Sequence, residues 1–147
     1  GAIASILDKL PHTFWVSYAD SYVLADIGQA NKDFGNEEDS IMVVLHNQDQ
    51  VETSNVTIDK ISNHVTQYVK NPPRGTHEWI DYGILRLTKA SFSSIAKDKP
   101  VDLREVVLNQ ITATRMRAFQ TNELFWDVGT PDRLQATTQE FQRRGWV

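Results

Sequence analysis

Apolar positions along the chain follow helical spacing in some stretches and strand spacing in others. The first of them recur every three or four residues, which is the spacing of one face of a helix. They are Ile3, Ile6, Leu7 and Leu10. This pattern predicts a helix that starts almost at the first residue and ends at Pro11. Because no capping residue precedes the helix, we expect a segment upstream of this chain, and a frayed but genuine N-terminus is the alternative.

Later apolar stretches alternate between strands and helices. Strands are predicted at Thr13–Tyr18, Ile41–His46, Val56–Ile58, His64–Val69, Ile80–Leu87 and Arg115–Gln120, and helices at Asp26–Phe34, from Asp102 and from Pro131. The continuous apolar run Ile41–His46 is typical of a strand covered on both faces of a largely parallel sheet. The two strands between residues 56 and 69 predict a hairpin, and the proline-containing stretch Asn71–Gly75 predicts a loop. The alternation indicates a single α/β domain over residues 1–147.

The composition is that of a globular protein and excludes several classes of partner. Of the 147 residues, 40% are hydrophobic and 23% are charged, which is enough to build one core. The net charge of −4 and the lack of a Lys/Arg run argue against a nucleic-acid partner. The absence of cysteine suits the cytoplasm, and no apolar run is long enough to predict contact with a membrane. A homo-oligomer is compatible with the sequence.

Two aspartates stand just after predicted strands, where a side chain can reach a ligand. Asp20 follows Thr13–Tyr18, and Asp127 follows a short apolar stretch and precedes a turn at Gly129. The run Thr130-Pro131-Asp132 then has the residues of a helix start. In open α/β sheets, ligands bind at the carboxyl ends of strands, where two carboxylates can share one Mg²⁺ ion with substrate phosphates. Turns also favour aspartate for structural reasons, so the residues alone leave both interpretations open.

Four segments resemble motifs of the sugar-phosphate nucleotidyltransferases, in the same order and at similar spacing. They are Tyr18-Ala19-Asp20-Ser21, Tyr68-Val69-Lys70, Trp79-Ile80-Asp81-Tyr82-Gly83-Ile84 and Phe125–Leu134. They resemble, in turn, the Gly-Asp-Ser/Thr motif, the Glu-Lys pair, the Asn/Asp-x-Gly-Ile strand and the Trp-x-Asp-x-Gly-Thr-Pro-x-x-Leu segment of that family. Gly1-Ala2-Ile3 is similar to the end of its Gly-Thr-Gly-Gly-Ala stretch. The Ile-Asp-Tyr-Gly form is most similar to the branch that acts on mannose- or heptose-type sugar phosphates.

The resemblance implies a Rossmann-like nucleotide-diphospho-sugar transferase sheet and a defined reaction. A nucleoside triphosphate would transfer its nucleotidyl group to a sugar 1-phosphate, which gives a nucleotide-sugar and pyrophosphate. By the same resemblance, Asp20 and Asp127 would hold Mg²⁺, and Lys70 would contact the sugar phosphate. The partners implied are therefore a nucleoside triphosphate and a sugar 1-phosphate.

The resemblance also implies residues on the sugar and nucleobase sides. Asp81 is a candidate for contact with sugar hydroxyls, with a solvent-facing strand aspartate as the alternative. The backbone of Gly83 would approach the sugar closely, with a β-bulge as the alternative. Gly1 and Ala2 would lie near the nucleobase.

The sequence also departs from the family at several points. The signature Gly-Gly-x-Gly-Thr-Arg-Leu followed by Pro-Lys, which cradles the triphosphate, does not occur in it. We therefore expect the chain to be the C-terminal portion of a nucleotidyltransferase domain, with a sheet incomplete on its N-terminal side and little turnover alone. Ala19 replaces the usual glycine, and Val69 stands where many members have a sugar-binding glutamate. The alternative is a non-catalytic remnant that binds sugar phosphates or serves as a structural or interaction module.

Overall fold

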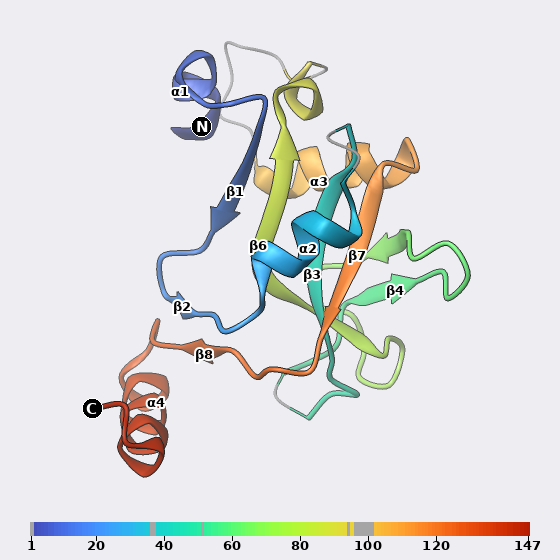
Figure 1. Cartoon of the computed structure of the whole chain (residues 1–147). Helices are drawn as coiled ribbons and strands as arrows, with labels where there is room; N and C mark the ends of the chain where they lie inside the picture. Colours follow the sequence, from blue (N-terminus) through green and yellow to red (C-terminus); the bar gives the residue numbers. More distant parts are fainter. Residues whose placement is uncertain (1, 36–37, 51, 94, 96–101) are drawn as a thin grey trace.

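Strands and helices alternate through the chain as the apolar pattern predicts (Figure 1). The structure is a computed structural model, and it describes residues 2–35, 38–50, 52–93, 95 and 102–147. The elements, in order, are α1 (Ala2–Ile6), the 3-10 turn η1 (Leu7–Lys9), β1 (Thr13–Ser17), β2 (Ser21–Tyr22), α2 (Ile27–Asp33), β3 (Ser40–His46), β4 (Val56–Ile58), β5 (Val65–Tyr68), β6 (Trp79–Thr88), the 3-10 turn η2 (Lys89–Phe92), α3 (Leu103–Thr112), β7 (Met116–Thr121), β8 (Trp126–Asp127) and α4 (Pro131–Arg144). Each predicted strand and helix is present, with ends that differ by a few residues.

The main sheet is mixed, so the prediction of a largely parallel sheet is wrong. Its order is β5-β4-β6-β3-β7, and β1 also pairs with β6. The ten-residue strand β6 runs antiparallel to β1, β3 and β4, and only β3 and β7 are parallel among the described pairs of this sheet. The apolar run of β3 indicates that both faces of this strand are covered, but it does not indicate whether the neighbouring strands are parallel or antiparallel to it.

Both faces of the sheet are packed, which explains why β3 is apolar at almost every position. Met42 and Val44 belong to a core cluster that also contains Val106 and Val107 of α3. Val43 and Leu45, which alternate with them, belong to a second cluster with residues 80, 82 and 84 of β6. In Figure 1, α2 crosses one face of the sheet and α3 lies behind the other. Side chains that alternate along one strand thus fill two separate layers.

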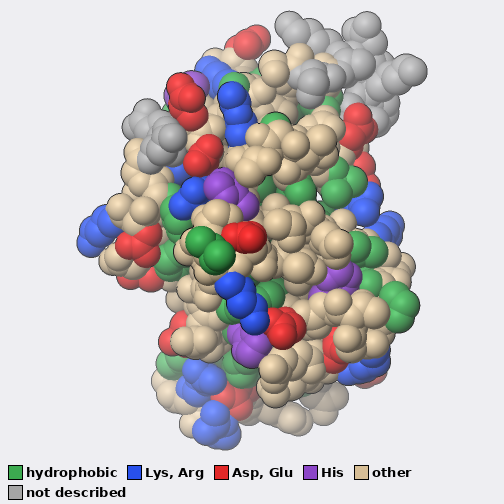
Figure 2. Space-filling view, turned by 90° about the vertical axis from the view of Figure 1, so that its right-hand side faces the viewer, with side chains coloured by type: hydrophobic (Ala, Val, Ile, Leu, Met, Phe, Trp, Pro, Cys, Tyr) green, Lys and Arg blue, Asp and Glu red, His purple; other side chains and the backbone are tan. Residues whose placement is uncertain are grey.

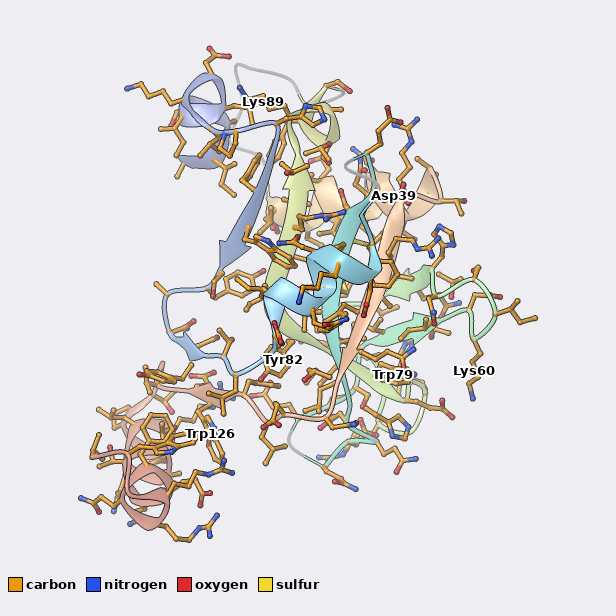
Figure 3. All side chains as sticks on the ribbon, viewed as in Figure 1. Asp39, Lys60, Trp79, Tyr82, Lys89 and Trp126 are labelled. Carbon is orange, nitrogen blue, oxygen red and sulfur yellow. The ribbon has the colours of Figure 1, made fainter. Side chains whose placement is uncertain are left out.

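A small second sheet joins the C-terminal helix to the rest of the molecule. β2 and β8 pair antiparallel, with Ser21 opposite Asp127. The rings of Tyr22 and Trp126 pack against Phe141 of α4, at centroid distances of 4.9 and 6.2 Å. Figure 3 shows Trp126 among the side chains between β8 and α4. This packing holds the C-terminal half of α4 against the second sheet.

The start of α4 follows the signals that the sequence predicts. The Thr130 hydroxyl accepts a hydrogen bond from the Arg133 amide over 3.3 Å, and Pro131 occupies the first helical position. The helix ends at Gly145, whose φ of 69° is the left-handed conformation that glycine adopts readily.

One face of the molecule carries both signs of charge (Figure 2). On the face shown in Figure 2, acidic and basic side chains of the described residues are interspersed and form no continuous basic patch. Within the described ranges, none of the helices has the length and apolar character needed to cross a bilayer.

Candidate functional site

The carboxylates of Asp20 and Asp127 face the same point beside Gly129. The β2–β8 pairing brings their two segments together, and the Val128 amide donates a hydrogen bond to the Asp20 carbonyl oxygen over 2.9 Å. A Cβ atom placed on Gly129 would lie 3.0 Å from Asp20 Oδ2 and 3.1 Å from Asp127 Oδ1. Because Gly129 has no side chain, the space between the two carboxylates stays open.

This pair of carboxylates fits the donor set that Mg²⁺ prefers. The ion is commonly bound by one or two carboxylates, with waters and substrate phosphates as its other ligands. Asp127 Oδ1 accepts a hydrogen bond from the Gly129 amide over 2.6 Å, which orients one of the two carboxylates. Within the described residues, no group of three or more histidine, cysteine, aspartate or glutamate side chains could hold a metal. A cation between Asp20 and Asp127 would therefore take its remaining oxygen ligands from water or from a substrate.

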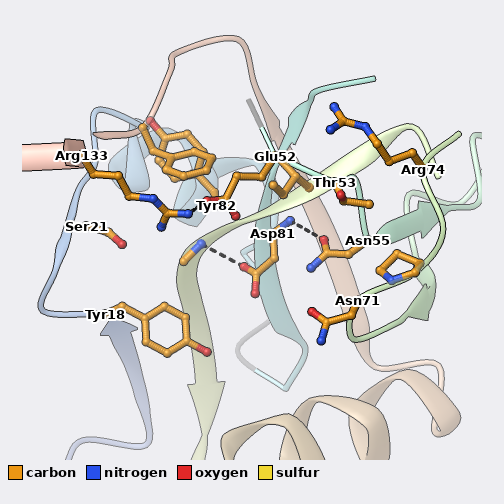
Figure 4. Close-up of a pocket in the computed structure, with 14 residues that line it drawn as sticks. Tyr18, Ser21, Glu52, Thr53, Asn55, Asn71, Arg74, Asp81, Tyr82 and Arg133 are labelled. Atoms are coloured by element: carbon orange, nitrogen blue, oxygen red, sulfur yellow. Dashed lines mark hydrogen bonds and ion pairs between the residues drawn. The ribbon is translucent and has the colours of Figure 1, made fainter. Parts of the chain in front are cut away.

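A cavity of about 530 Å³ lies next to these carboxylates. Its walls come from the ends of β1 and β6, from the loops after β3 and β5, and from the first turn of α4 (Figure 4). Asp81 and Gly83, two predicted site residues, line it. So do Ser21, which follows Asp20 in the chain, and Arg133, which is ion-paired with Asp127. Neither Asp20 nor Asp127 lines the cavity itself, and Ser21 and Arg133 connect them to it.

Gly83 has a conformation and a position that favour glycine. Its φ is +82°, and a Cβ atom there would lie 3.2 Å from Tyr18 Cδ2 and 3.5 Å from Ser21 Oγ. It also lies at the register shift between β3 and β6, so the predicted alternative of a bulge is confirmed. The bulge turns the Gly83 backbone toward the cavity that it lines.

Asp81 is held by hydrogen bonds at the floor of the cavity. Its Oδ1 accepts from the Gly83 amide over 2.9 Å, and its Oδ2 accepts from the Tyr68 hydroxyl over 3.0 Å. Its own amide donates to Asn55 Oδ1 over 3.0 Å (Figure 4). Burial raises the pKa of Asp81, and the hydrogen bonds from Gly83 and Tyr68 partly oppose that rise. Asp81 is thus partly exposed and lines the cavity, and its contact with a sugar stays a prediction.

Two phenols stand near this carboxyl group. Burial raises the pKa of Tyr18, and the charge of Asp81 raises it further. The same two causes, in the same order, raise the pKa of Tyr68 well above its usual range. Both hydroxyls therefore stay protonated at neutral pH and can donate hydrogen bonds.

The other predicted site residues lie elsewhere. Lys70 is exposed at the end of β5 and is not among the residues that line the cavity, although the next residue, Asn71, is. Ala2 lines a separate apolar cavity of about 210 Å³ beside Phe92 and Leu103. Gly1 lies outside the described residues. The structure thus brings Asp20 to Asp127 and Asp81 to Gly83, and it does not bring Lys70 or Ala2 to either pair.

Arg133 and Glu52 are site residues that the sequence did not reveal. Arg133 lies in the first turn of α4, and its guanidinium group forms ion pairs with both Asp127 and Glu52. Glu52 comes from the loop between β3 and β4, far from the other two in sequence. No local pattern indicates the contact between Arg133 and Glu52, which are 81 residues apart in the sequence.

Several solved structures have a similar fold. A protein from Bacillus anthracis assigned as a glucose-1-phosphate thymidylyltransferase superposes with a TM-score of 0.77 at 16% identity, over 95% of this chain and 58% of its own. HddC from Yersinia pseudotuberculosis, complexed with GMP-PN, gives a TM-score of 0.72 at 20% identity, over 95% of this chain and 60% of its own. A UTP-bound UGPase from Acinetobacter baumannii gives a TM-score of 0.72 at 16% identity, over 95% and 54%.

These likenesses show the fold of the chain. No protein-family model and no curated protein sequence matches it. The chain spans less than two-thirds of the length of the three similar proteins. The chain therefore has the α/β, Rossmann-like fold of nucleotide-diphospho-sugar transferases.

Proposed function

We propose that this chain forms the metal and sugar-phosphate side of a sugar-1-phosphate nucleotidyltransferase. The complete reaction joins a nucleoside triphosphate to a sugar 1-phosphate and releases pyrophosphate. The observation that carries the proposal is the meeting of Asp20 and Asp127 beside Gly129, next to the cavity lined by Asp81 and Gly83. The fold shared with enzymes of this class supports it.

The cavity has the polar groups that a phosphorylated sugar requires. The carboxyl group of Asp81 and the hydroxyl of Tyr18 offer hydrogen bonds to sugar hydroxyls. The amide groups of Asn55 and Asn71 line the same space. Arg133 supplies positive charge for a phosphate group. We take mannose 1-phosphate and heptose 1-phosphate as the first candidates, from the Ile-Asp-Tyr-Gly form of β6.

The residues of this chain would act mainly by positioning and by charge. Asp20 and Asp127 would hold Mg²⁺, which when bound neutralises charge on the phosphoryl oxygens. The Gly83 backbone and Asp81 would orient the sugar, so that its phosphate oxygen faces the α-phosphorus of the nucleotide. Closely placed dipoles and cations would stabilise the charge that develops there.

Binding and turnover are measured separately to test this function. Calorimetric titration of the chain with mannose 1-phosphate or heptose 1-phosphate should show binding that strengthens with Mg²⁺. Asp127→Asn should weaken sugar-phosphate binding in the presence of Mg²⁺ by roughly tenfold or more, since it removes one ligand of the ion. Asp132→Asn is the matched control, because Asp132 carries the same charge in the first turn of α4. Absence of saturable binding for every sugar 1-phosphate would contradict the proposal.

Turnover is measured as pyrophosphate release with Mg²⁺ and each nucleoside triphosphate. The assay uses the 147-residue chain and the product of the complete native reading frame. We expect little release from the 147 residues, because they lack the Gly-rich triphosphate signature. Release by the longer product, lost in Asp20→Asn and Asp127→Asn, would establish the reaction.

A second candidate function is binding of sugar phosphates without catalysis. One observation favours it: Lys70, the expected cation for the sugar phosphate, is exposed and does not line the cavity. Mg²⁺-dependent binding without pyrophosphate release from either product would select this function.

A further inference from the structure

Arg133 forms an ion pair with Asp127, one of the two candidate metal ligands. Its Nη1 pairs with Asp127 Oδ2, and its Nη2 pairs with Glu52 Oε1. Figure 4 shows the side chain reaching from α4 toward Glu52, at the wall of the cavity. The other Asp127 oxygen, Oδ1, is the one that faces Asp20. One guanidinium group therefore contacts the cavity and the candidate metal site at once.

The position of Arg133 gives it a charge-balancing role. Two carboxylates that face one point repel each other, and a guanidinium group on Asp127 reduces that repulsion. A divalent cation beside Asp127 would in turn repel the guanidinium group. The two positive charges therefore compete for the same carboxylate.

The ion pair of Arg133 with Glu52 is easy to exchange, whereas the Asp127 side chain of the other pair is 23% exposed. The side chains of Arg133 and Glu52 are 47% and 44% exposed, and exposed ion pairs contribute little net free energy. A phosphate group offers the guanidinium two oxygens in a matching planar geometry. Because Arg133 already lines the cavity, an anionic ligand there can take over its N–H groups.

We propose that Arg133 couples divalent-cation binding at Asp20 and Asp127 to anion binding in the cavity. Without an anion, Arg133 neutralises Asp127 and weakens cation binding. With a phosphate-like anion in the cavity, Arg133 pairs with the anion and Asp127 becomes free for the cation. By linkage, the cation strengthens anion binding by the same factor. This inference rests on the proposed metal site, and it adds that Arg133 makes cation binding there depend on an anion in the cavity.

The test measures Mn²⁺ binding to the 147-residue chain from the electron paramagnetic resonance signal of the free ion. Sulfate serves as the anion probe, and titrations in protein-free buffer correct for its own association with Mn²⁺. We expect sulfate to tighten Mn²⁺ binding by the native chain. In Arg133→Gln, Mn²⁺ should bind at least roughly twofold more tightly without sulfate, since an exposed ion pair is worth about this factor and Asp127 is partly buried. Sulfate should then have no further effect.

Matched variants separate this coupling from general effects of charge. Arg143→Gln removes the same charge from α4 at an ion pair with Glu140, and it should behave like the native chain. Arg133→Lys keeps the charge beside Asp127, so its Mn²⁺ affinity without sulfate should stay near the native value. Thermal melting of each variant verifies that it is folded.

The outcomes distinguish failure of the coupling from failure of the metal site. Equal Mn²⁺ affinity in the native chain and in Arg133→Gln, with binding lost in Asp127→Asn, would overturn the coupling and leave the metal site intact. Mn²⁺ binding that is unchanged in Asp127→Asn would overturn both. A sulfate effect that persists in Arg133→Gln would also overturn the coupling.

Discussion

Asp20 and Asp127 come from opposite ends of the chain, and their carboxylates flank a single glycine. The gap between them exists because Gly129 has no Cβ atom, which would lie 3.0 Å from one carboxylate oxygen and 3.1 Å from the other. Both distances are shorter than ordinary contacts of a Cβ atom, so a methyl group there must displace at least one carboxylate. This relationship makes Gly129 a test of the candidate metal site.

Gly129→Ala should weaken Mn²⁺ binding by roughly tenfold, the loss typical when metal ligands are misplaced. The free energy of unfolding should change little, because Gly129 is exposed. Gly35→Ala is the matched control, since the nearest atom to its Cβ would be 4.0 Å away. Unchanged Mn²⁺ affinity in Gly129→Ala would mean that the cation does not bind between these two carboxylates.

Gly83→Ala should lower both stability and sugar-phosphate affinity. An alanine at φ +82° is strained by roughly 1–2 kcal/mol, and its methyl group would meet Tyr18 Cδ2 at 3.2 Å. Gly75→Ala shares the strain, at φ +77°, but has nothing within 4 Å of its Cβ. Chemical denaturation and calorimetry of both variants separate the two effects. If Gly75→Ala weakens sugar-phosphate binding as much as Gly83→Ala does, the contact with Tyr18 has no special role.

The sequence predicted elements whose signals are local. Thr130 and Pro131 mark the start of α4, and the apolar run of β3 marks a strand with two covered faces. The resemblance to nucleotidyltransferases selected Asp20 and Asp127 as a pair, whereas the residues alone left their pairing open. The reason is physical: the β2–β8 pairing that joins them has two residues in each strand, too few for a periodic pattern.

Other features escaped prediction because they depend on tertiary contacts. The antiparallel direction of β6 is set by the route of the chain between β5 and β6, and apolar spacing does not encode strand direction. The contact of Arg133 with Asp127 and Glu52 depends on the placement of α4 against the second sheet. The sequence therefore located the strands that carry the site, but it did not indicate that the guanidinium group of Arg133 pairs with Asp127.

Asp81 should make the stability of the protein decrease as the pH rises above acidic values. Burial raises the pKa of Asp81, so the folded protein holds this proton more tightly than the unfolded chain. The resulting stability is complete below the ordinary pKa of about 4 and is lost as the pH rises through the folded pKa. Asp81→Asn removes this ionisation and should flatten that decrease in urea unfolding at a series of pH values.

Asp49→Asn gives a control of opposite sign. Hydrogen bonds from the backbone amides of Ser54 and Gly75 lower the pKa of Asp49. Ionised Asp49 therefore stabilises the folded protein above the ordinary pKa of an aspartate, and this contribution is lost in acid. Asp49→Asn should therefore be less stable than the native chain at neutral pH and approach it at low pH. For Asp81→Asn, the contradicting outcome is a free energy of unfolding that depends on pH as it does in the native chain, since Asp81 would then not be the group with the raised pKa.

Tyr82→Phe should loosen the two segments that carry the candidate metal ligands. The Tyr82 side chain is 1% exposed, and its hydroxyl accepts from the Leu24 amide over 3.1 Å and donates to the Leu124 carbonyl oxygen over 3.0 Å. Leu24 follows β2 and Leu124 precedes β8, so this hydroxyl joins the neighbours of Asp20 to those of Asp127. Without it, a backbone amide and a carbonyl lose their partner, which costs roughly 1–3 kcal/mol in the free energy of unfolding.

Mn²⁺ affinity decides whether this hydroxyl matters for the site or only for the fold. If it positions the two carboxylates, Tyr82→Phe should weaken Mn²⁺ binding at temperatures where the variant is still fully folded. Tyr22→Phe, at a tyrosine that is 55% exposed on β2, should change neither stability nor affinity by a comparable amount. A destabilised Tyr82→Phe that binds Mn²⁺ like the native chain would show that the β2–β8 pairing alone is enough to hold Asp20 against Asp127.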